Sequence, residues 1–523
     1  MLQPILIDSS VFKEMRDKGG VYVDKTAYLH RLISGINARY FIARPRRFGK
    51  SLMITTLKAI FEGRRELFEG LAISRTDWEW EKFPVLYFDF SLAVGNTAER
   101  FERNFNDCVR NTLANAGVKY DSGMTPEMNL GMAIDSLNAA NKGKGVVVLI
   151  DEYDAPVAHL LAEQEEAKKA RELLSAFYLQ LKPRTDKIRF LMITGVSKFT
   201  KMSVFSALSN LVDISFNDNY ATMLGYTEEE LDQFFSDHIQ AHAELMRLDN
   251  SAYRAELKRW FNGYRFGKFS PETVYNPVSI GMNLFEQAPI FQSCWSSTGK
   301  ASMLMNFLKR DEFLAVDMEC VQGVLEQDFD VTDIAALRPV PMLFQTGYLT
   351  IGDFSPATRM YSLRVPDEEV RRDLATLMTA VAADRDTSWG SSLGGMLLNA
   401  QWDEFFDGLK ALYASLPYGA KEGRVHEHSF ERCLAVLLKS QGIQCVTEAR
   451  QADGQADIVA VHACGVFIFE LKVDAPAETA LAQVRAKGYD APYRGRNLPI
   501  WLVGLCFDRA TRQLADARAE RLS

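Results

Sequence analysis

Three consecutive residues, Gly49, Lys50 and Ser51, are of the types that bind the phosphate groups of a nucleotide. In a phosphate-binding loop, which reads G-x-x-x-x-G-K-[ST], the lysine contacts the β and γ phosphates and the hydroxyl holds Mg²⁺. The stretch Ala43–Ser51 reads ARPRRFGKS, so Arg44 stands where that pattern has its first glycine. The alternative interpretation is an ordinary basic loop that precedes a helix.

The residues around this tripeptide have the order that a phosphate loop requires. Arg39–Ala43 is typical of a short apolar strand, and Lys50–Glu62 of an amphipathic helix that ends at Gly63. Backbone N–H groups and the positive end of the helix dipole would then bind an anionic triphosphate. We therefore expect these residues to contact ATP: Arg44, Arg46, Arg47, Phe48, Gly49, Lys50 and Ser51.

Two carboxylates follow a second apolar strand, in the run GVVVLIDEYD at Gly145–Asp154. Ligands of open α/β sheets bind at the carboxyl ends of strands, where these acids lie. Asp151 is placed to hold Mg²⁺ through water, and Glu152 to polarise the water that attacks the γ phosphate. A further strand, Arg189–Thr194, ends in Thr194, which could sense the γ phosphate or serve as a cap or turn residue.

Another group of charged residues lies near the C-terminus, on a predicted antiparallel hairpin. The runs ADIVAV and VFIFELK flank a short turn at Ala463–Gly465, and alternation places Glu470 and Lys472 on one face with Asp457 on the partner strand. Metal-dependent phosphodiester hydrolysis needs carboxylates that hold one or two Mg²⁺ ions and a lysine that orients the attacking water. The alternative is an exposed hairpin with a cross-strand ion pair.

Helices predicted on either side of this hairpin add two polar groups. His426–Leu438 carries Glu427 and Glu431, either of which could give a further carboxylate to the metal. We take Glu431 as the metal ligand, beside Asp457 and Glu470. The following helix, at residues 477–489, carries Gln483 among small residues.

Strands and helices alternate along the N-terminal part of the chain, where Val85–Phe90 is a further predicted strand. This order predicts a parallel, doubly wound α/β domain. From about Thr227, which begins a capped helix, to about Arg385 the pattern is mostly helical. The runs FNGYRF, VYNP and WSSTGK in that region are interpreted as tight turns that support aromatic packing. We expect three domains, at residues 1–226, 227–390 and 391–523.

The composition is that of an ordinary globular protein of 523 residues, 47% of them apolar and 24% charged. The start lacks the basic and apolar segments of a signal peptide, and no stretch reaches the ~20 apolar residues of a membrane helix. The seven cysteines include no C-x-x-C pair. We therefore expect a cytoplasmic protein with reduced thiols. A net charge of −8 argues against a surface that is wholly a nucleic-acid footprint, but it allows a local basic groove.

Several of these runs together resemble a known family. YVDKT, RPRRFGKS, LIDEYDAP, TGVSKF, FNGYRF and VYNP are similar to signatures of the bacterial AAA-ATPase-like family that is fused to a PD-(D/E)XK nuclease-superfamily domain. In that family an arginine in place of the first loop glycine is usual. The C-terminal part resembles the nuclease partner through Asp457, Glu470, Leu471, Lys472 and Gln483. It departs from the family in reading Gln455 where an arginine is often found before the aspartate.

The resemblance implies a P-loop ATPase domain, a mostly helical middle region and a C-terminal α/β nuclease-like domain. It also implies ATP and Mg²⁺ as cofactors, and nucleic acid, with DNA expected, as the partner. We expect ATP hydrolysis to gate the nuclease; the alternative is an ATP-driven regulatory or assembly switch whose nuclease-like domain only binds nucleic acid. An arginine finger donated in trans would require a homo-oligomer, and spacing selects none of these candidates: Arg44, Arg46, Arg47, Arg184 and Arg265.

Overall fold

The computed structural model divides the chain into two compact units, and each is described by itself. The first consists of Met1–Gln292 and Asp317–Asp367, and the second of Ser293–Val316 and Glu368–Ser523. The structure describes residues 2–7, 9–35, 38–161, 163–197, 211–285, 291–293, 321–329, 339–383, 387–415, 427–451, 454–511 and 513–522. The WSSTGK run at residues 295–300, interpreted above as a turn, lies outside these residues.

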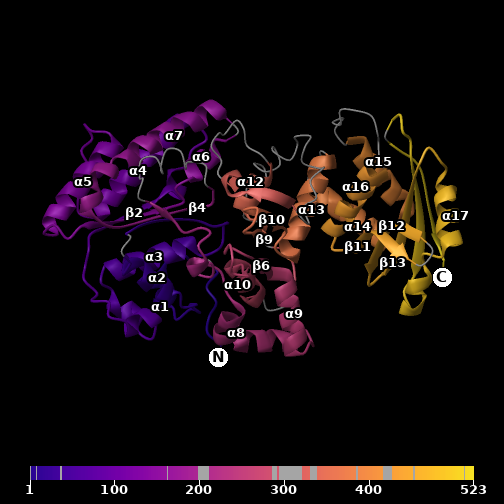
Figure 1. The fold of residues 1–523 in the computed structure, drawn as a ribbon, viewed down its shortest axis with the longest axis horizontal. Coiled ribbons are helices and arrows are strands. Elements are labelled where there is room, and N and C mark those ends of the chain that lie inside the picture. Colours follow the sequence, from indigo (N-terminus) through magenta and orange to yellow (C-terminus); the bar gives the residue numbers. More distant parts are fainter. Residues whose placement is uncertain are drawn as a thin grey trace. The chain divides into compact units, whose positions relative to one another are not determined.

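A sheet of five parallel strands forms the centre of the first unit (Figure 1). In sheet order the strands are β2 (Val85–Asp89), β3 (Val146–Asp151), β4 (Ile188–Gly195), β1 (Arg39–Ala43) and β5 (Val212–Asp213). All six residues of β3 are buried, as its unbroken run of apolar residues predicts for a strand covered on both faces. Because β4 lies between β1 and β3, Thr194 at its end stands between the phosphate loop and the acids.

Helices cover both faces of this sheet, so the predicted doubly wound α/β fold is confirmed. Figure 1 shows α1 (Phe12–Asp17), α2 (Thr26–Ile33) and α3 (Lys50–Phe61) on one side, with α4 (Ala98–Asn115), α5 (Pro126–Ala140) and α7 (Gln164–Leu179) on the other. The short α6 (Ala155–His159) follows β3. Helix α3 starts directly at the phosphate loop and packs on β2, β3 and β4, which places the loop at the carboxyl edge of the sheet.

The rest of the first unit adds helices and small antiparallel sheets. Helix α8 (Glu228–Leu245) begins with a capping box between Thr227 and Glu230, as the sequence TEEE predicts. The other elements are α9 (Asn250–Phe261), β6 (Asn262–Tyr264), β7 (Val274–Tyr275), α10 (Pro277–Phe285), β8 (Val321–Leu325), α12 (Pro339–Thr346), β9 (Thr350–Ser355) and β10 (Met360–Arg364). Strand β6 pairs with β7, and β10 lies between β8 and β9.

In its described residues, the second unit combines α-helices with a mixed sheet that keeps chain order. The helices are α13 (Glu368–Ala383), α14 (Thr387–Leu398), α15 (Trp402–Ser415) and α16 (Glu427–Ser440). The sheet contains β11 (Gln444–Gln451), β12 (Gly454–His462), β13 (Gly465–Val473), β14 (Ile500–Phe507) and β15 (Leu514–Arg521), and α17 (Ala477–Lys487) precedes β14. All neighbouring strands are antiparallel except β13 and β14.

Strand β13 has an apolar core on each of its faces. Phe467, Phe469 and Leu471 pack with residues of α14, α15 and α16, whereas Val466 and Ile468 pack with residues of α17. Because side chains alternate along a strand, Glu470 and Lys472 project to the α17 side. The predicted hairpin of ADIVAV and VFIFELK is thus confirmed, and both charged residues of its second strand face α17.

The division into units differs from the expected three domains. The expected boundary at 226/227 falls inside the first unit, where Tyr226 bridges Tyr275, and the boundary at 390/391 falls inside α14. Short 3₁₀ helices lie at Arg65–Phe68, Ala72–Arg75, Phe90–Ala93, Lys182–Lys187, Asp218–Tyr220, Glu326–Phe329 and Ala491–Arg496. Among the described residues, no helix has both the length and the apolar character that crossing a membrane requires.

Candidate active sites

The loop before α3 has the backbone of an anion-binding turn. Gly49 is the N-cap residue, adopts a left-handed conformation with φ of 84°, and caps the helix with no side-chain hydrogen bond. The N-cap residue therefore offers no side-chain acceptor to the first N–H groups of α3, which suits a helix N-terminus that binds phosphate. Lys50 is buried, and its Nζ donates to the carbonyl oxygens of Arg44 (3.0 Å) and Pro45 (2.9 Å). The loop thus wraps around the ammonium group of its own lysine.

The acids at the end of β3 lie close enough to Lys50 to affect its pKa. Burial lowers the pKa of Lys50, while Glu152 and Asp151 oppose that change. Burial likewise raises the pKa of Glu152, and the Lys50 charge opposes it. Asp151 Oδ1 accepts hydrogen bonds from the hydroxyl of Thr194 (2.5 Å) and the amide of Glu152 (3.1 Å). Lys50, Asp151, Glu152 and Thr194 are therefore brought together at one edge of the sheet.

Asp154 has a role that sequence reasoning missed. It is buried, and its carboxylate accepts hydrogen bonds from the amides of Val196 (3.1 Å) and Ser197 (2.7 Å) and from the Ser197 hydroxyl. Tyr153 donates its hydroxyl hydrogen to the carbonyl of Ser197 at 2.8 Å. A Cβ added to Gly195 would lie 2.4 Å from the Tyr153 ring, which no packing tolerates. The end of β3 therefore holds the end of β4 in position.

A cavity of about 220 Å³ opens beside the phosphate loop. Part of its lining is polar and comes from Lys50, Ser51 and Glu152. The remainder is largely apolar and comes from the N-terminal segment and from α8 and α10, including Ile5, Ile7, Phe235 and Val278. The cavity therefore suits an elongated molecule with anionic groups at one end and an apolar group at the other.

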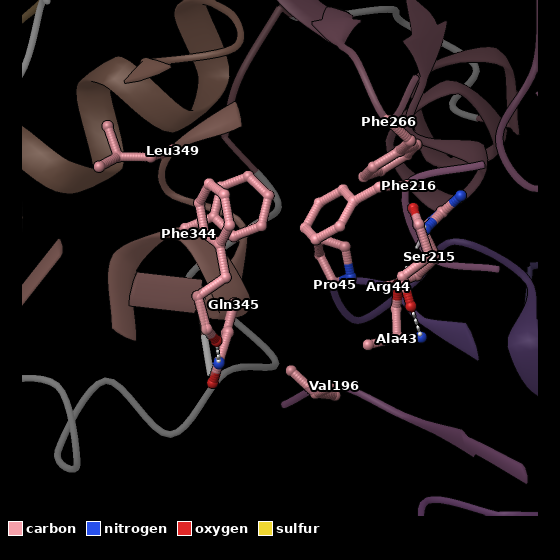
Figure 2. A pocket seen from close by; sticks show the side chains of 11 residues that line it. Ala43, Arg44, Pro45, Val196, Ser215, Phe216, Phe266, Phe344, Gln345 and Leu349 are labelled. Atoms are coloured by element: carbon pink, nitrogen blue, oxygen red, sulfur yellow. Dashed lines mark hydrogen bonds between the residues drawn. The ribbon is translucent and has the colours of Figure 1, made fainter. Parts of the chain in front are cut away.

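The side chain of Arg44 points away from this cavity, which corrects the expectation that its guanidinium lies beside the phosphates. Arg44 is buried and donates to the carbonyls of Ala43 (3.0 Å) and Ser215 (2.6 Å). Its guanidinium lies 4.1 Å from the centre of the Phe266 ring. Figure 2 shows Arg44 and Phe266 on one wall of a small second cavity, across from Phe344. Burial lowers the pKa of Arg44 to about 9.

In the second unit the predicted hairpin residues meet around one carboxylate. Glu470 is buried, and its Oε1 accepts hydrogen bonds from Lys472 Nζ (2.9 Å) and from Gln483 Nε2 of α17. Asp457 Oδ2 accepts a 2.6 Å hydrogen bond from the amide of Leu471, beside Glu470. Burial and the Asp457 charge raise the pKa of Glu470 to about 7, although Lys472 lowers it.

The surroundings of Glu470 fit a divalent cation. Its second oxygen, Oε2, is buried and accepts no hydrogen bond within the described part of the chain. A buried carboxylate oxygen without a partner is costly, and a bound cation would remove that cost. Asp457 and Glu470 could therefore hold Mg²⁺, and the ion would supply positive charge to the phosphate and lower the pKa of a bound water.

The third expected metal ligand does not join this pair. Glu431 is buried in α16, yet no group of three acidic, histidine or cysteine side chains among the described residues is arranged to hold a metal ion. The side chain of Glu427 lies outside the described residues. The structure thus brings together Asp457, Glu470, Lys472 and Gln483, and among the described residues Glu431 does not complete a three-residue metal-binding group with Asp457 and Glu470.

Comparisons with known proteins identify a domain family at each end of the chain. A family model described as a predicted AAA-ATPase matches residues 4–205, and one for the PD-(D/E)XK nuclease superfamily matches residues 425–517. A protein of Azotobacter chroococcum mcd 1, named "Uncharacterized protein in vnfD 5'region", is 33% identical over 515 residues, which cover 96% of this chain and 95% of that protein. The chain belongs to the family of predicted AAA-ATPases that carry a C-terminal PD-(D/E)XK nuclease-superfamily domain.

In this predicted AAA-ATPase family, the contacts of the candidate arginine fingers distinguish those bound within the fold from those near the phosphate loop. Arg184 pairs with Asp135, and the Arg265 guanidinium donates to three backbone carbonyls. The Arg44 guanidinium is buried against Ser215 and Phe266. Arg46 remains near the site, since its charge acts on both Lys50 and Glu152, and Arg47 lines the cavity.

Proposed function

We propose that this protein binds and hydrolyses ATP in its first unit and that this reaction gates a metal-dependent nuclease in its second unit. The observation that carries the proposal is the presence, in one chain, of two separate constellations. In the first, Lys50 faces Asp151 and Glu152 at an uncapped helix N-terminus. In the second, Asp457 and Lys472 flank the buried carboxylate of Glu470.

In the proposed ATPase reaction, Lys50 exchanges its two loop carbonyls for oxygens of the β and γ phosphates. The N–H groups of the first turn of α3 bind the same anion. Glu152, whose pKa is raised by burial, orients the attacking water and accepts its proton. Thr194, hydrogen-bonded to Asp151, lies where it can respond to the γ phosphate. Ser51 and Asp151 would hold Mg²⁺, which supplies charge neutralisation at the phosphates.

The apolar lining of the 220 Å³ cavity supports the choice of a nucleotide over a simple polyphosphate. Residues such as Ile5, Phe235 and Val278 could contact a base while Lys50 and Ser51 contact the phosphates. A base bound there would touch the N-terminal segment together with α8 and α10. Nucleotide binding would therefore be communicated from the loop to elements that lie outside the central sheet.

In the proposed nuclease reaction, Asp457 and Glu470 would hold the metal ion. Lys472, which donates a hydrogen bond to Glu470, orients the water or stabilises the charge on the phosphorane. Gln483 fixes the Glu470 carboxylate through its side-chain amide. We propose DNA as the substrate and the cytoplasm as the location, the latter because the seven cysteines are odd in number and scattered, which does not fit the disulfide framework of a secreted protein.

The experiment is plasmid cleavage by the full chain with Mg²⁺, in the presence and absence of ATP. ATP-dependent cleavage is the expected result. Cleavage that is equal with and without ATP would contradict gating, while absence of cleavage alongside measurable ATP turnover would contradict the nuclease assignment. RNA of the same sequence, tested in parallel, would show whether DNA is the preferred substrate.

A second candidate function is an ATP-driven switch whose nuclease-like domain only binds nucleic acid. It is favoured by the absence, among the described residues, of a third ligand-type side chain beside Asp457 and Glu470. Measuring the molecular mass of the protein in solution, with and without nucleotide, shows whether ATP changes its oligomeric state, which matters for both candidate functions. If the arginine finger comes from a neighbouring copy, ATP should promote a homo-oligomer.

A further inference from the structure

Arg44, the residue that replaces the usual first loop glycine, is anchored to a segment far along the chain. Its guanidinium donates to the Ser215 carbonyl, 171 residues away, and lies over the Phe266 ring at 4.1 Å. A guanidinium over an aromatic face is attracted by the negative charge density of the ring. In this geometry one end of the loop is fixed by Phe266.

Phe48, at the other end of the loop, packs on the same segment. Its ring lies 4.7 Å from the ring of Tyr264 and 5.2 Å from that of Phe266, both in edge-to-face geometry. Phe48 is buried. The two ends of the loop therefore contact the same short segment. Arg44 lies over Phe266, and Phe48 packs on both Tyr264 and Phe266.

The aromatic pair is itself held rigidly. Tyr264 donates its hydroxyl hydrogen to the Gly347 carbonyl at 2.9 Å. The backbone of Arg265, between the two rings, exchanges hydrogen bonds with the Thr350 hydroxyl at 2.8 and 3.0 Å. The rings are therefore a fixed support, tied to β9 and to the segment that precedes it.

The loop needs such a support because its sequence does not favour its conformation. Arg47 adopts φ of 69°, a left-handed conformation that is unfavourable for a residue with a side chain. A glycine-rich loop reaches such angles without strain. Here the contacts of Arg44 and Phe48 with the aromatic rings hold the loop backbone in this conformation. A glycine at position 44 has no side chain that could make such a contact.

We infer that Arg44 and Phe266 are positioning residues of the phosphate loop: the guanidinium held over the ring sets the loop backbone in the geometry that binds the triphosphate. The inference rests on the proposed ATP binding, and neither Arg44 nor Phe266 lines the 220 Å³ cavity beside the loop. It predicts that restoring the usual glycine at position 44 weakens ATP binding, which is the opposite of what the loop pattern alone suggests.

The test is calorimetric titration of the full chain with ATP and Mg²⁺, well below the melting temperature. Phe266→Leu keeps the apolar volume but removes the ring, and Arg44→Gly restores the usual pattern. We expect each to raise the dissociation constant for ATP by about fivefold or more, as loss of a buried cation–π contact implies. Phe266→Tyr keeps a ring and should remain within about twofold of the wild type. The matched control is Phe269→Leu, a ring of the same segment that is 63% exposed.

Two further readouts separate positioning from a general loss of stability. A purely structural role would lower the melting temperature and leave the affinity of the folded molecules unchanged. A positioning role should raise KM for ATP more than it lowers kcat, and should accelerate hydrogen exchange of the amides at residues 46–50 in Phe266→Leu. Arg44→Lys keeps the charge but loses the planar guanidinium, so its dissociation constant for ATP should lie between those of the wild type and Arg44→Gly. This variant replaces Phe266→Leu in the test if Phe266→Leu does not fold.

The outcomes distinguish this inference from the proposed function. Wild-type affinity in both Arg44→Gly and Arg44→Lys, or in Phe266→Leu, would overturn the positioning role while ATP binding stands. Failure of the wild type to bind ATP, with its fold intact, would overturn the proposed function and this inference with it.

Discussion

Asp154 Oδ2 accepts a 2.7 Å hydrogen bond from the amide of Ser197, and the Ser197 hydroxyl donates to the same oxygen. This contact joins the ends of β3 and β4, two strands that carry Glu152 and Thr194 toward the phosphate loop. The third acid of the DEYD run, Asp154, is thus a structural brace, while the first two, Asp151 and Glu152, lie close to Lys50 of the loop.

Removing this brace should weaken both the fold and the ATPase. Asp154→Ala leaves the buried N–H groups of Val196 and Ser197 without their acceptor, which should cost on the order of 3 kcal/mol of unfolding free energy. Scanning calorimetry should show a lower melting temperature, and ATP turnover should fall with it. The control is Asp186→Ala, an exposed acid in the 3₁₀ helix that precedes β4. An unchanged melting temperature in Asp154→Ala would contradict the bracing role.

Lys50→Ala should abolish ATP binding. The ammonium group is expected to donate charge-assisted hydrogen bonds to two phosphates, and losing both implies a drop in affinity of at least about 100-fold. Calorimetric titration with ATP measures it. Lys58→Ala, on the same helix and paired only loosely with Glu62 at 3.8 Å, should bind as the wild type does. Equal affinities of Lys50→Ala and Lys58→Ala would show that the loop is not the nucleotide site.

Glu152→Gln should keep ATP binding and lose turnover, because the amide can still accept a hydrogen bond from water but cannot take its proton. General-base catalysis contributes about 10² to 10⁴ in rate, so kcat should fall by that order. Phosphate release and ATP titration on the same preparation separate the two effects. The exposed Glu172→Gln is the matched control. Rapid hydrolysis by Glu152→Gln would mean that another group is the base.

Lys472→Ala should abolish plasmid cleavage while ATP turnover continues, since Lys472 and the ATPase acids belong to different units. A loss of about 100-fold or more is expected when the group that stabilises a developing phosphorane charge is removed. Lys487→Ala, an exposed lysine on α17, is the control. Chelation of divalent ions with EDTA should stop cleavage by every variant. Cleavage by Lys472→Ala at the wild-type rate would remove Lys472 from the mechanism.

Much of the architecture could be predicted from the order of residues. The strands at Arg39–Ala43, Val85–Asp89 and Val146–Asp151 lie where short apolar runs indicated them, and the hairpin around residues 463–464 forms as alternation predicts. These features depend on hydrophobic periodicity and turn chemistry, which act over a few neighbouring residues. The capping box at Thr227 is equally local, so it too was predictable.

Partners that come from distant parts of the chain were not predictable in this way. Residue type alone made Arg44 a phosphate contact and Glu431 a third metal ligand, yet Arg44 is buried against Ser215 and Phe266, and Glu431 does not join Asp457 and Glu470. The middle region seemed a separate domain because its elements change character near residue 227. In the structure the FNGYRF run, predicted as a tight turn, instead forms the end of α9 and strand β6, and its Tyr264 and Phe266 pack on the phosphate loop.

Residue types and spacing therefore account for the presence of two chemical sites, because Gly-Lys-Ser and Glu-x-Lys carry their groups on adjacent or alternate positions of one element. Folding in three dimensions decided which charged groups reach those sites. A guanidinium can bind phosphate or stack on an aromatic ring. Arg44 stacks on a ring because the fold places Phe266, more than two hundred residues further along the chain, next to it. Asp154 acquires its bracing role in the same manner, from Ser197, which lies 43 residues further along the chain.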